Sequence, residues 1–117
     1  MSRPRKLRTV CCMPETNEFG PANNLSSESV ILSVDQYETI RVIDLEGLTQ
    51  EECADQMQVA RTTIQGIYEE ARKIIADAIV NGKTLRIEGG SYKLCDEEKR
   101  PCGKCCSNRR MHQHRGQ

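Results

Sequence analysis

The chain is poor in aromatic residues: it has no tryptophan, one phenylalanine and three tyrosines among 117 residues. Any core must therefore be built mostly from aliphatic side chains. This composition favours helices that pack through Ile, Val, Leu and Ala, and it argues against a β-sandwich. A core this small gives only marginal stability, so a bound metal ion or a second subunit would stabilise the fold further.

The sequence also lacks a long apolar segment. No stretch approaches the ~18 apolar residues of a membrane span, and the N-terminus lacks the apolar part of a signal peptide. We therefore expect a cytoplasmic protein in a reducing compartment. Its seven cysteines are then expected to be thiols or metal ligands, and not a disulfide framework.

A net charge is absent as well, because 17 basic and 17 acidic residues balance. The charges are nevertheless segregated. Residues 28–58 carry one base, Arg41, against eight acids, and residues 93–117 carry seven bases against three acids. The first ten residues carry four bases and no acid: Arg3, Arg5, Lys6 and Arg8. An acidic block between basic ends suits a nucleic-acid-binding protein, but it also suits ordinary solvated faces and tails.

Capping residues predict two short helices. Ser33 begins the first helix, with Gln36 three residues later as its capping-box partner, and this helix ends before Gly47. Thr49 begins the second helix, with Glu52 as the partner in an S/T-x-x-E capping box, and this helix covers about residues 50–57.

A third, longer helix is the clearest signal in the sequence. It is predicted from Arg61 to Asn81, with Gly82 as its C-cap. Apolar residues at intervals of three and four form one continuous stripe along it, which we assign to the core. The stripe comprises Ile64, Ile67, Tyr68, Ala71, Ile74, Ile75, Ala78 and Ile79.

Short β-prone segments flank the helices. Residues 9–13 and 84–88 are predicted strands, and the second is expected to pair with the strand near Val10 or with a copy in another subunit. Residues 14–29 are predicted to be a loop, because Pro, Gly, Asn and Ser cluster there. The predicted fold is therefore mainly α, with three helices and a small β element from the N-terminal and post-helix strands.

Residues 45–64 meet the geometric demands of a helix-turn-helix. Ala54 is small enough for a close crossing of the two helices, and Val59 is an apolar residue in the turn between them. The first turn of the third helix is polar, because its hydrophilic residues lie off the apolar stripe: Arg61, Thr62, Thr63 and Gln65.

The same segment, LEGLTQEECADQMQVARTTI, resembles region four of bacterial sigma factors, whose pattern is roughly L-E-G-L-S-x-x-E-I-A-x-x-L-G-x-S-x-x-T-V. Together with RPRK at residues 3–6, FGP at 19–21, DLEGL at 44–48 and LRIEGG at 85–90, it resembles a small prokaryotic family of uncharacterised, predicted DNA-binding proteins. The resemblance covers roughly residues 1–92, and the cysteine-rich tail lies outside it. It implies a sigma region-four-like helix-turn-helix of the winged-helix-like superfamily.

Three positions depart from what such motifs favour. Ala60 stands where Ser or Thr begins the recognition helix, which forfeits a capping bond of about 1 kcal/mol. Gln58 stands where related motifs have Gly before the apolar residue of the turn. Gly66 costs about 1 kcal/mol relative to alanine inside a helix, and it would let DNA or a partner helix approach closely.

Arg61 and Gln65 are the predicted base-contacting residues, because Arg pairs with guanine and Gln with adenine. Phosphate or groove contacts are predicted for the other polar residues: Thr62, Thr63, Thr49, Arg72 and Lys73, with Arg3, Arg5, Lys6 and Arg8 as an N-terminal arm. The alternative for each is a solvated surface residue, and Thr49 has a further alternative as a helix cap.

The tail contains a C-x-x-C motif, Cys102 to Cys105, whose spacing lets two thiolates chelate one metal ion. The remaining predicted ligands are Cys95, Cys106, His112 and His114, joined by Cys11 and Cys12 if the N-terminal strand lies nearby. Zinc is the expected metal, an iron–sulfur cluster stays open, and the alternative is a disordered tail of reduced thiols. A redox enzyme would place C-x-x-C in a βαβ unit, which these flanks do not resemble.

The sequence thus predicts a double-stranded-DNA-binding transcriptional regulator, acting as a homodimer, without enzymatic activity. Two other functions stay open: a protein-interaction module whose acidic helices bind polymerase or another basic partner, and a metal-responsive regulator that senses through the tail. Three segments are predicted: residues 1–30 as arm, strand and loop, 31–92 as the helix-turn-helix domain with its following strand, and 93–117 as the tail.

Overall fold

The computed structural model describes residues 7–23 and 28–94. Three helices and two small sheets make up this part, and about half of it is helical. The predicted arm residues Arg3, Arg5 and Lys6 lie outside the described residues, as do all the predicted ligands of the tail: Cys95, Cys102, Cys105, Cys106, His112 and His114. No helix among the described residues is long and apolar enough to cross a membrane.

The three predicted helices are confirmed. Helix α1 spans Val34–Ile40, α2 spans Gln50–Met57 and α3 spans Arg61–Asn81. Both α1 and α2 begin with a complete capping box, and Gly82 ends α3 in the left-handed conformation with φ of 64°. These boundaries follow from local chemistry, because capping residues supply hydrogen-bond partners to the backbone N–H and C=O groups at helix ends that have no partner within the helix.

The end of the first helix differs from a regular α-helix. After Ile40 the chain widens into a π-helical segment, η1, over Arg41–Leu45. The backbone N–H of Glu46 donates to the carbonyl of Arg41 at 2.9 Å, which is the i→i+5 pattern of a π-turn. Gly47 then takes a φ of 84° and ends the segment, as predicted.

The strands form two sheets, and their pairing corrects the prediction. Strand β4, Thr84–Ile87, pairs antiparallel with β2, Glu18–Phe19, and parallel with β3, Ser29–Leu32. The strand near Val10, β1 (Arg8–Val10), instead pairs in parallel with β5 (Tyr92–Leu94). The predicted pairing of residues 84–88 with the Val10 strand is therefore wrong. The prediction of a loop throughout residues 14–29 is also wrong, because β2 lies within this range, β3 begins at its end, and both pair with β4.

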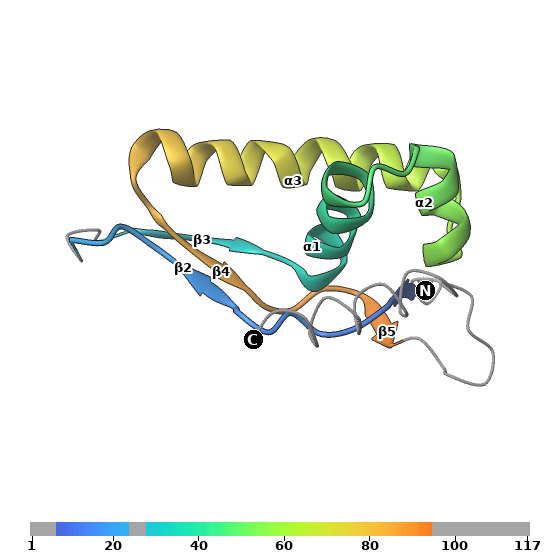
Figure 1. Cartoon of the computed structure of the whole chain (residues 1–117), viewed down its shortest axis with the longest axis horizontal. Coiled ribbons are helices and arrows are strands. Elements are labelled where there is room, and N and C mark those ends of the chain that lie inside the picture. The colour runs from blue at the N-terminus through green and yellow to red at the C-terminus, as the bar shows by residue number, and fades with distance from the viewer. Residues whose placement is uncertain (1–6, 24–27, 95–117) are drawn as a thin grey trace, which may run out of the picture.

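Helix α3 runs along one side of the molecule and organises both parts of the core (Figure 1). The β2–β4–β3 sheet lies under its C-terminal half, while α1 and α2 lie near its N-terminal half. One core cluster joins η1, α2 and the start of α3: Cys11, Val42, Cys53, Ala54, Met57 and Ile64. A second joins the strands, α1 and the middle of α3: Val10, Leu32, Val34, Ala71 and Ile87.

The apolar stripe of α3 is buried or half-buried at every position but one. Ile64 and Ala71 are fully buried, whereas Ile79 is 74% exposed. The assignment of Ile79 to the core is therefore wrong. Ala78 beside it is only 8% exposed, so Ile79 lies on a side of α3 that the rest of the described chain does not cover, and periodicity alone does not fix burial there.

The glycine pair after β4 allows the chain to pass close to α1. The carbonyl of Gly89 accepts a hydrogen bond from the backbone N–H of Val34 at 2.9 Å. Gly90 has a φ of 107°, and a Cβ there would collide with the Asp35 carboxylate and with Ser33. The positive φ and the collision of a Cβ explain why glycine is required at position 90.

Candidate nucleic-acid interface

The segment between α2 and α3 is a three-residue turn with a left-handed residue at its start. Gln58 has φ 59° and ψ 46°, and its backbone N–H donates to the carbonyls of Ala54 and Asp55. The backbone N–H of Val59 donates to the Ala54 carbonyl at 3.1 Å. Ala60 then adopts the extended conformation of an N-cap, and α3 starts at Arg61. The chain therefore changes direction sharply between the two helices.

The inner side of this turn is packed as predicted. Ala54 is 4% exposed, and Val59 packs against the cluster that contains Met57 and Ile64. A contact that the sequence did not predict adds to this packing: the Thr9 hydroxyl donates to Oε1 of Gln58 at 3.1 Å. Strand β1 thus holds the left-handed residue of the turn through a long-range hydrogen bond.

The outer side of the first turn of α3 is polar. Arg61, Thr62 and Gln65 are exposed, Thr63 is half-buried, and Ile64 between them is fully buried. Arg61 and Gln65 are four residues apart, so their side chains lie on the same face of the helix. The structure therefore brings these predicted residues together on one accessible surface.

Farther along α3 the exposed surface carries both signs of charge. Glu69 and Glu70 are exposed, followed by Arg72 and Lys73. The Arg72 guanidinium donates to the Tyr68 hydroxyl at 2.6 Å and lies 3.8 Å from the Asp44 carboxylate. Arg72 is thus held against η1, although its side chain is still 61% exposed.

Tyr68 connects α3 to η1. Its hydroxyl donates to Oδ1 of Asp44 at 2.7 Å, and this hydrogen bond, followed by burial, raises the pKa of Tyr68 above its ordinary value. The phenol therefore remains a hydrogen-bond donor at neutral pH. Beside it, a groove of about 830 Å³ is lined on its apolar part by Ile40, Ile75 and Ile79.

Two other predicted DNA-contacting residues have structural partners. The Thr49 side chain accepts from the backbone N–H of Glu52 at 3.1 Å, so it caps α2. Arg8 lies in β1, where its side chain is 15% exposed and 3.8 Å from the Asp35 carboxylate. Arg8 therefore belongs to a strand and not to an exposed arm.

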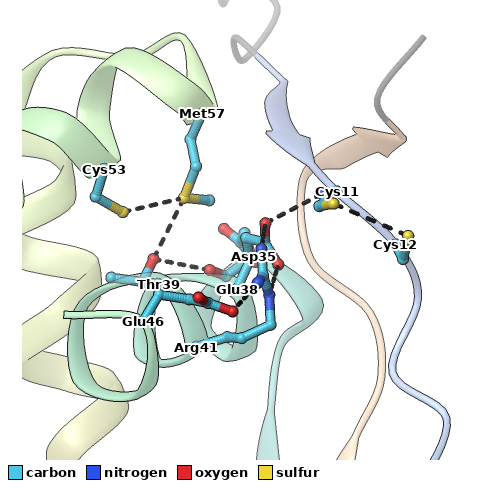
Figure 2. A network of polar contacts seen from close by, with 9 residues as sticks. All are labelled: Cys11, Cys12, Asp35, Glu38, Thr39, Arg41, Glu46, Cys53 and Met57. Carbon is cyan, nitrogen blue, oxygen red and sulfur yellow. Dashed lines mark hydrogen bonds and ion pairs between the residues drawn. The ribbon is translucent and has the colours of Figure 1, made fainter. Parts of the chain in front are cut away.

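A buried network of charged groups joins α1 and η1 (Figure 2). Arg41 donates to both carboxylate oxygens of Glu38, at 3.1 and 2.7 Å, and to Glu46 at 3.2 Å. Glu38 is 2% exposed and also accepts from the backbone N–H of Cys11 at 3.1 Å. The network thus ties the end of β1 to α1 and η1. The sequence pattern did not predict this network, although Arg41 is the single base among the eight acids of residues 28–58 and lies three residues after Glu38.

Sulfur atoms gather next to this network. The Met57 sulfur accepts from the Thr39 hydroxyl and from the Cys53 thiol, at 3.6 Å each. The Sγ atoms of Cys11 and Cys12 lie 3.9 Å apart (Figure 2). Cys53, at 0% exposure, fills a core position.

The N-cap of α3 lacks a side-chain partner, which gives a direct test of the turn geometry. Ala60 has φ −69° and ψ 152°, the N-cap conformation, but makes no side-chain capping bond. We expect Ala60→Ser to raise the free energy of unfolding by about 1 kcal/mol, because its hydroxyl can accept from a free N–H of the first turn. Urea unfolding followed by circular dichroism measures the change. Ala76→Ser, at an exposed position inside α3, is the matched control and should not stabilise.

Comparison with known proteins shows the family. A family described as "Protein of unknown function DUF134" matches residues 1–95. The chain belongs to this family. One relative of this chain is a UPF0251 protein of Desulfitobacterium hafniense strain Y51. The two are 60% identical over 112 residues, which cover 94% of this chain and 90% of the relative.

Other relatives carry the same name. The UPF0251 protein of Caldicellulosiruptor bescii is 52% identical over 106 residues, covering 89% of this chain and 75% of its own length. The UPF0251 protein of Thermoanaerobacter sp. strain X514 is 49% identical over 102 residues, which cover 86% of this chain and 90% of the relative. No solved structure matches the chain. The predicted family resemblance is thus confirmed, and the relatives' names say nothing about the DNA-binding activity that it implies.

Proposed function

We propose that this DUF134 chain binds double-stranded DNA sequence-specifically and acts as a transcriptional regulator, with α2, the turn and α3 forming a helix-turn-helix. One observation carries the proposal: the first turn of α3 exposes Arg61, Thr62 and Gln65 while Ile64 anchors it in the core. A recognition helix needs this combination, because its outer side chains must reach base edges from a fixed position. The proposed role is DNA binding in the cytoplasm, and it includes no enzymatic reaction.

The distribution of charge limits the base contacts to the first turn of α3. Glu69 and Glu70 would face phosphates if the helix lay along the groove, and this repulsion favours entry by the N-terminal end. Arg61 and Gln65 are then the residues for guanine and adenine. Lys73 and Arg72 are positioned for the phosphate backbone, with further positive charge available from Arg3, Arg5 and Lys6.

A single first turn buries little DNA surface, so the proposal includes a homodimer on two half-sites. Large apolar side chains near the far end of α3 are open to solvent, with Ile79 74% and Val80 78% exposed. We assign this end of α3 to the contact between subunits, because exposed apolar side chains that lie together mark interaction surfaces. Light scattering of the protein–duplex complex gives the number of chains bound.

The test uses the sequences that the wild-type chain selects from random duplexes. On a selected duplex, we expect Arg61→Ala and Gln65→Ala each to weaken binding by about tenfold to 100-fold, since a bidentate base contact contributes about 1–3 kcal/mol. Fluorescence anisotropy at several salt concentrations gives both the affinity and its salt dependence. Gln65→Ala should leave the salt dependence unchanged, because glutamine neutralises no phosphate.

Arg86→Ala is the matched control. Arg86 is a half-exposed arginine on β4, outside the helix-turn-helix, and its loss should change the affinity less than about twofold. Selection of no duplex, or equal affinity of all three variants and the wild type, would refute the proposal.

A second function is favoured by the surface of α2. Glu51, Glu52 and Asp55 are all exposed, so this helix presents an acidic face suited to a basic protein partner such as polymerase. Under this function, charge reversal at Glu51 and Asp55 would abolish binding to the partner while the Arg61 and Gln65 variants would leave it intact.

A further inference from the structure

Two cysteine thiols meet where β1 ends. The chain bends at Cys11 and Cys12, and their Sγ atoms lie 3.9 Å apart (Figure 2). In an extended strand, consecutive side chains point to opposite faces, so the bend is what brings the two sulfurs together. The sulfur atoms of a disulfide are about 2.05 Å apart, so the two thiols are within about 2 Å of the separation that would join them.

The two thiols differ in their access to solvent. Cys11 is 6% exposed and belongs to the core cluster that contains Met57 and Ile64, whereas Cys12 packs against this cluster and is partly exposed. An oxidant from solution therefore reaches Cys12 first, and Cys11 is the neighbouring thiol that can react with the oxidised sulfur. Redox-sensing cysteines are often accessible and lie beside such a resolving cysteine.

A disulfide between adjacent residues is strained. The trans peptide bond holds the Cα atoms of Cys11 and Cys12 about 3.8 Å apart, below the about 4.4–6.8 Å that disulfides usually span. Such strain makes the bond easier to reduce, and strained disulfides are the labile, regulatory ones. A disulfide at this pair is therefore suited to reversible formation and not to permanent stabilisation.

Strand β1 connects the pair to the turn between α2 and α3. The backbone N–H of Cys11 donates to the Glu38 carboxylate at 3.1 Å, and the Thr9 hydroxyl donates to Gln58 in the turn, also at 3.1 Å. Because the peptide bond fixes the two Cα atoms, ring closure would have to change the backbone and side-chain angles at Cys11. This change would pull the Cys11 side chain out of the cluster that contains Ile64 and would loosen the hold of β1 on the turn.

We propose that Cys11 and Cys12 are a redox-sensitive modification site, which forms a disulfide on reaction with hydrogen peroxide and thereby loosens the start of α3. The Cys12 thiolate attacks one peroxide oxygen, the O–O bond breaks, and a sulfenic acid and hydroxide form; the hydroxide takes up the proton that the thiol released. The Cys11 sulfur then attacks the sulfenic sulfur, so that the S–S bond forms and water leaves. Two thiols and one peroxide thus give one disulfide and two water molecules.

A small thiol reverses the modification. The thiolate of one glutathione attacks the disulfide, and a second glutathione releases the mixed disulfide that results. The two protein sulfurs are reduced to thiols, and the two glutathione molecules leave joined as oxidised glutathione.

The experiment follows one tryptic peptide of the full chain. Residues 9–41 lie between Arg8 and Arg41 and contain no cysteine other than this pair. After peroxide treatment and alkylation, we expect this peptide to carry no alkyl group and to be two hydrogens lighter than the reduced peptide. Glutathione should restore both alkylation sites. In Cys12→Ser, the buried Cys11 should remain reduced under the same treatment, whereas the control Cys53→Ala should behave like the wild type, because Cys53 is buried in the core.

Hydrogen exchange tests the coupling to the turn without DNA. We expect the amides of residues 58–64 to exchange about tenfold faster in the oxidised chain, while those of residues 72–81 keep their rate. On a selected duplex, the oxidised chain should bind about tenfold more weakly, and Cys12→Ser should be insensitive to peroxide. Only the duplex measurement rests on the proposed function, so the mass and exchange measurements decide this proposal even if the chain binds no DNA.

Three results would overturn the proposal. One is a 9–41 peptide that stays fully alkylated after peroxide treatment of the wild-type chain, a readout that needs no variant to fold. Another is a peptide that is cross-linked to a different cysteine or oxidised beyond rescue by glutathione. The third is a disulfide that forms while exchange at residues 58–64 is unchanged, which would separate the pair from the turn.

Discussion

Glu38→Ala is expected to destabilise the protein by about 3–5 kcal/mol, since removal of one partner leaves a buried charge uncompensated. Arg41 is 6% exposed and would lose its nearest counter-charge, Glu38 at 2.7 Å, while Glu46 lies at 3.2 Å. The hydrogen bond from the backbone N–H of Cys11 to the Glu38 carboxylate would also be lost. A loss of this size is a large part of the about 5–15 kcal/mol that stabilises a typical domain. Urea unfolding monitored by circular dichroism gives the difference.

Two variants separate charge from other effects of the substitution. Glu70→Ala removes an exposed glutamate from a helix and should change the unfolding free energy by no more than about 0.5 kcal/mol. Glu38→Leu/Arg41→Met removes both charges and should recover much of the loss, because no buried charge is left unpaired. If Glu38→Ala unfolded at the same urea concentration as Glu70→Ala, the buried network would not contribute to stability.

Ile64→Ala is expected to cost about 2–5 kcal/mol, because it removes a fully buried side chain and leaves a cavity. Ile64 joins α3 to the core cluster of η1 and α2, so this loss falls on the packing that orients the first turn of α3. The measurement is again the free energy of unfolding in urea.

Ile79→Ala is the matched control for this substitution. It makes the same chemical change in the same helix, at a position that is 74% exposed. We expect a change of no more than about 0.5 kcal/mol at a protein concentration at which the chain is monomeric, because the proposed subunit contact would otherwise cover Ile79. Equal losses at the two positions under this condition would contradict the burial of Ile64 and the exposure of Ile79.

The consequence for function lies in how the turn is held. Packing of Val59 and Ile64 and the Thr9–Gln58 hydrogen bond together hold the turn and the start of α3. A recognition surface needs such support, because base contacts are lost when side chains are displaced by small distances. The Ile64 variant therefore tests the packing that holds the turn, and the Arg61 and Gln65 variants test the surface that this packing supports.

The amino-acid sequence by itself determined the helices. Ser33 and Thr49 form the predicted capping boxes, Gly82 ends α3, and the apolar spacing from Ile64 to Ala78 predicts the buried face. Each of these signals lies within a few residues of the structure it specifies, because caps and helical faces depend on local backbone geometry. The exposure of Arg61 and Gln65 on the first turn followed from the same periodicity.

Only the tertiary structure decided the strand partners, the buried charges and the convergence of Cys11 with Cys12. Strands β2 and β3 are too short to carry a pattern of their own, and they exist because β4, more than fifty residues later in the chain, supplies hydrogen bonds on both sides. Arg41 is buried because Glu38 and Glu46 converge on it, and Ile79 is exposed because nothing described in the chain reaches it. Pairing and burial depend on which distant segments meet in space, and no local window of sequence contains that information.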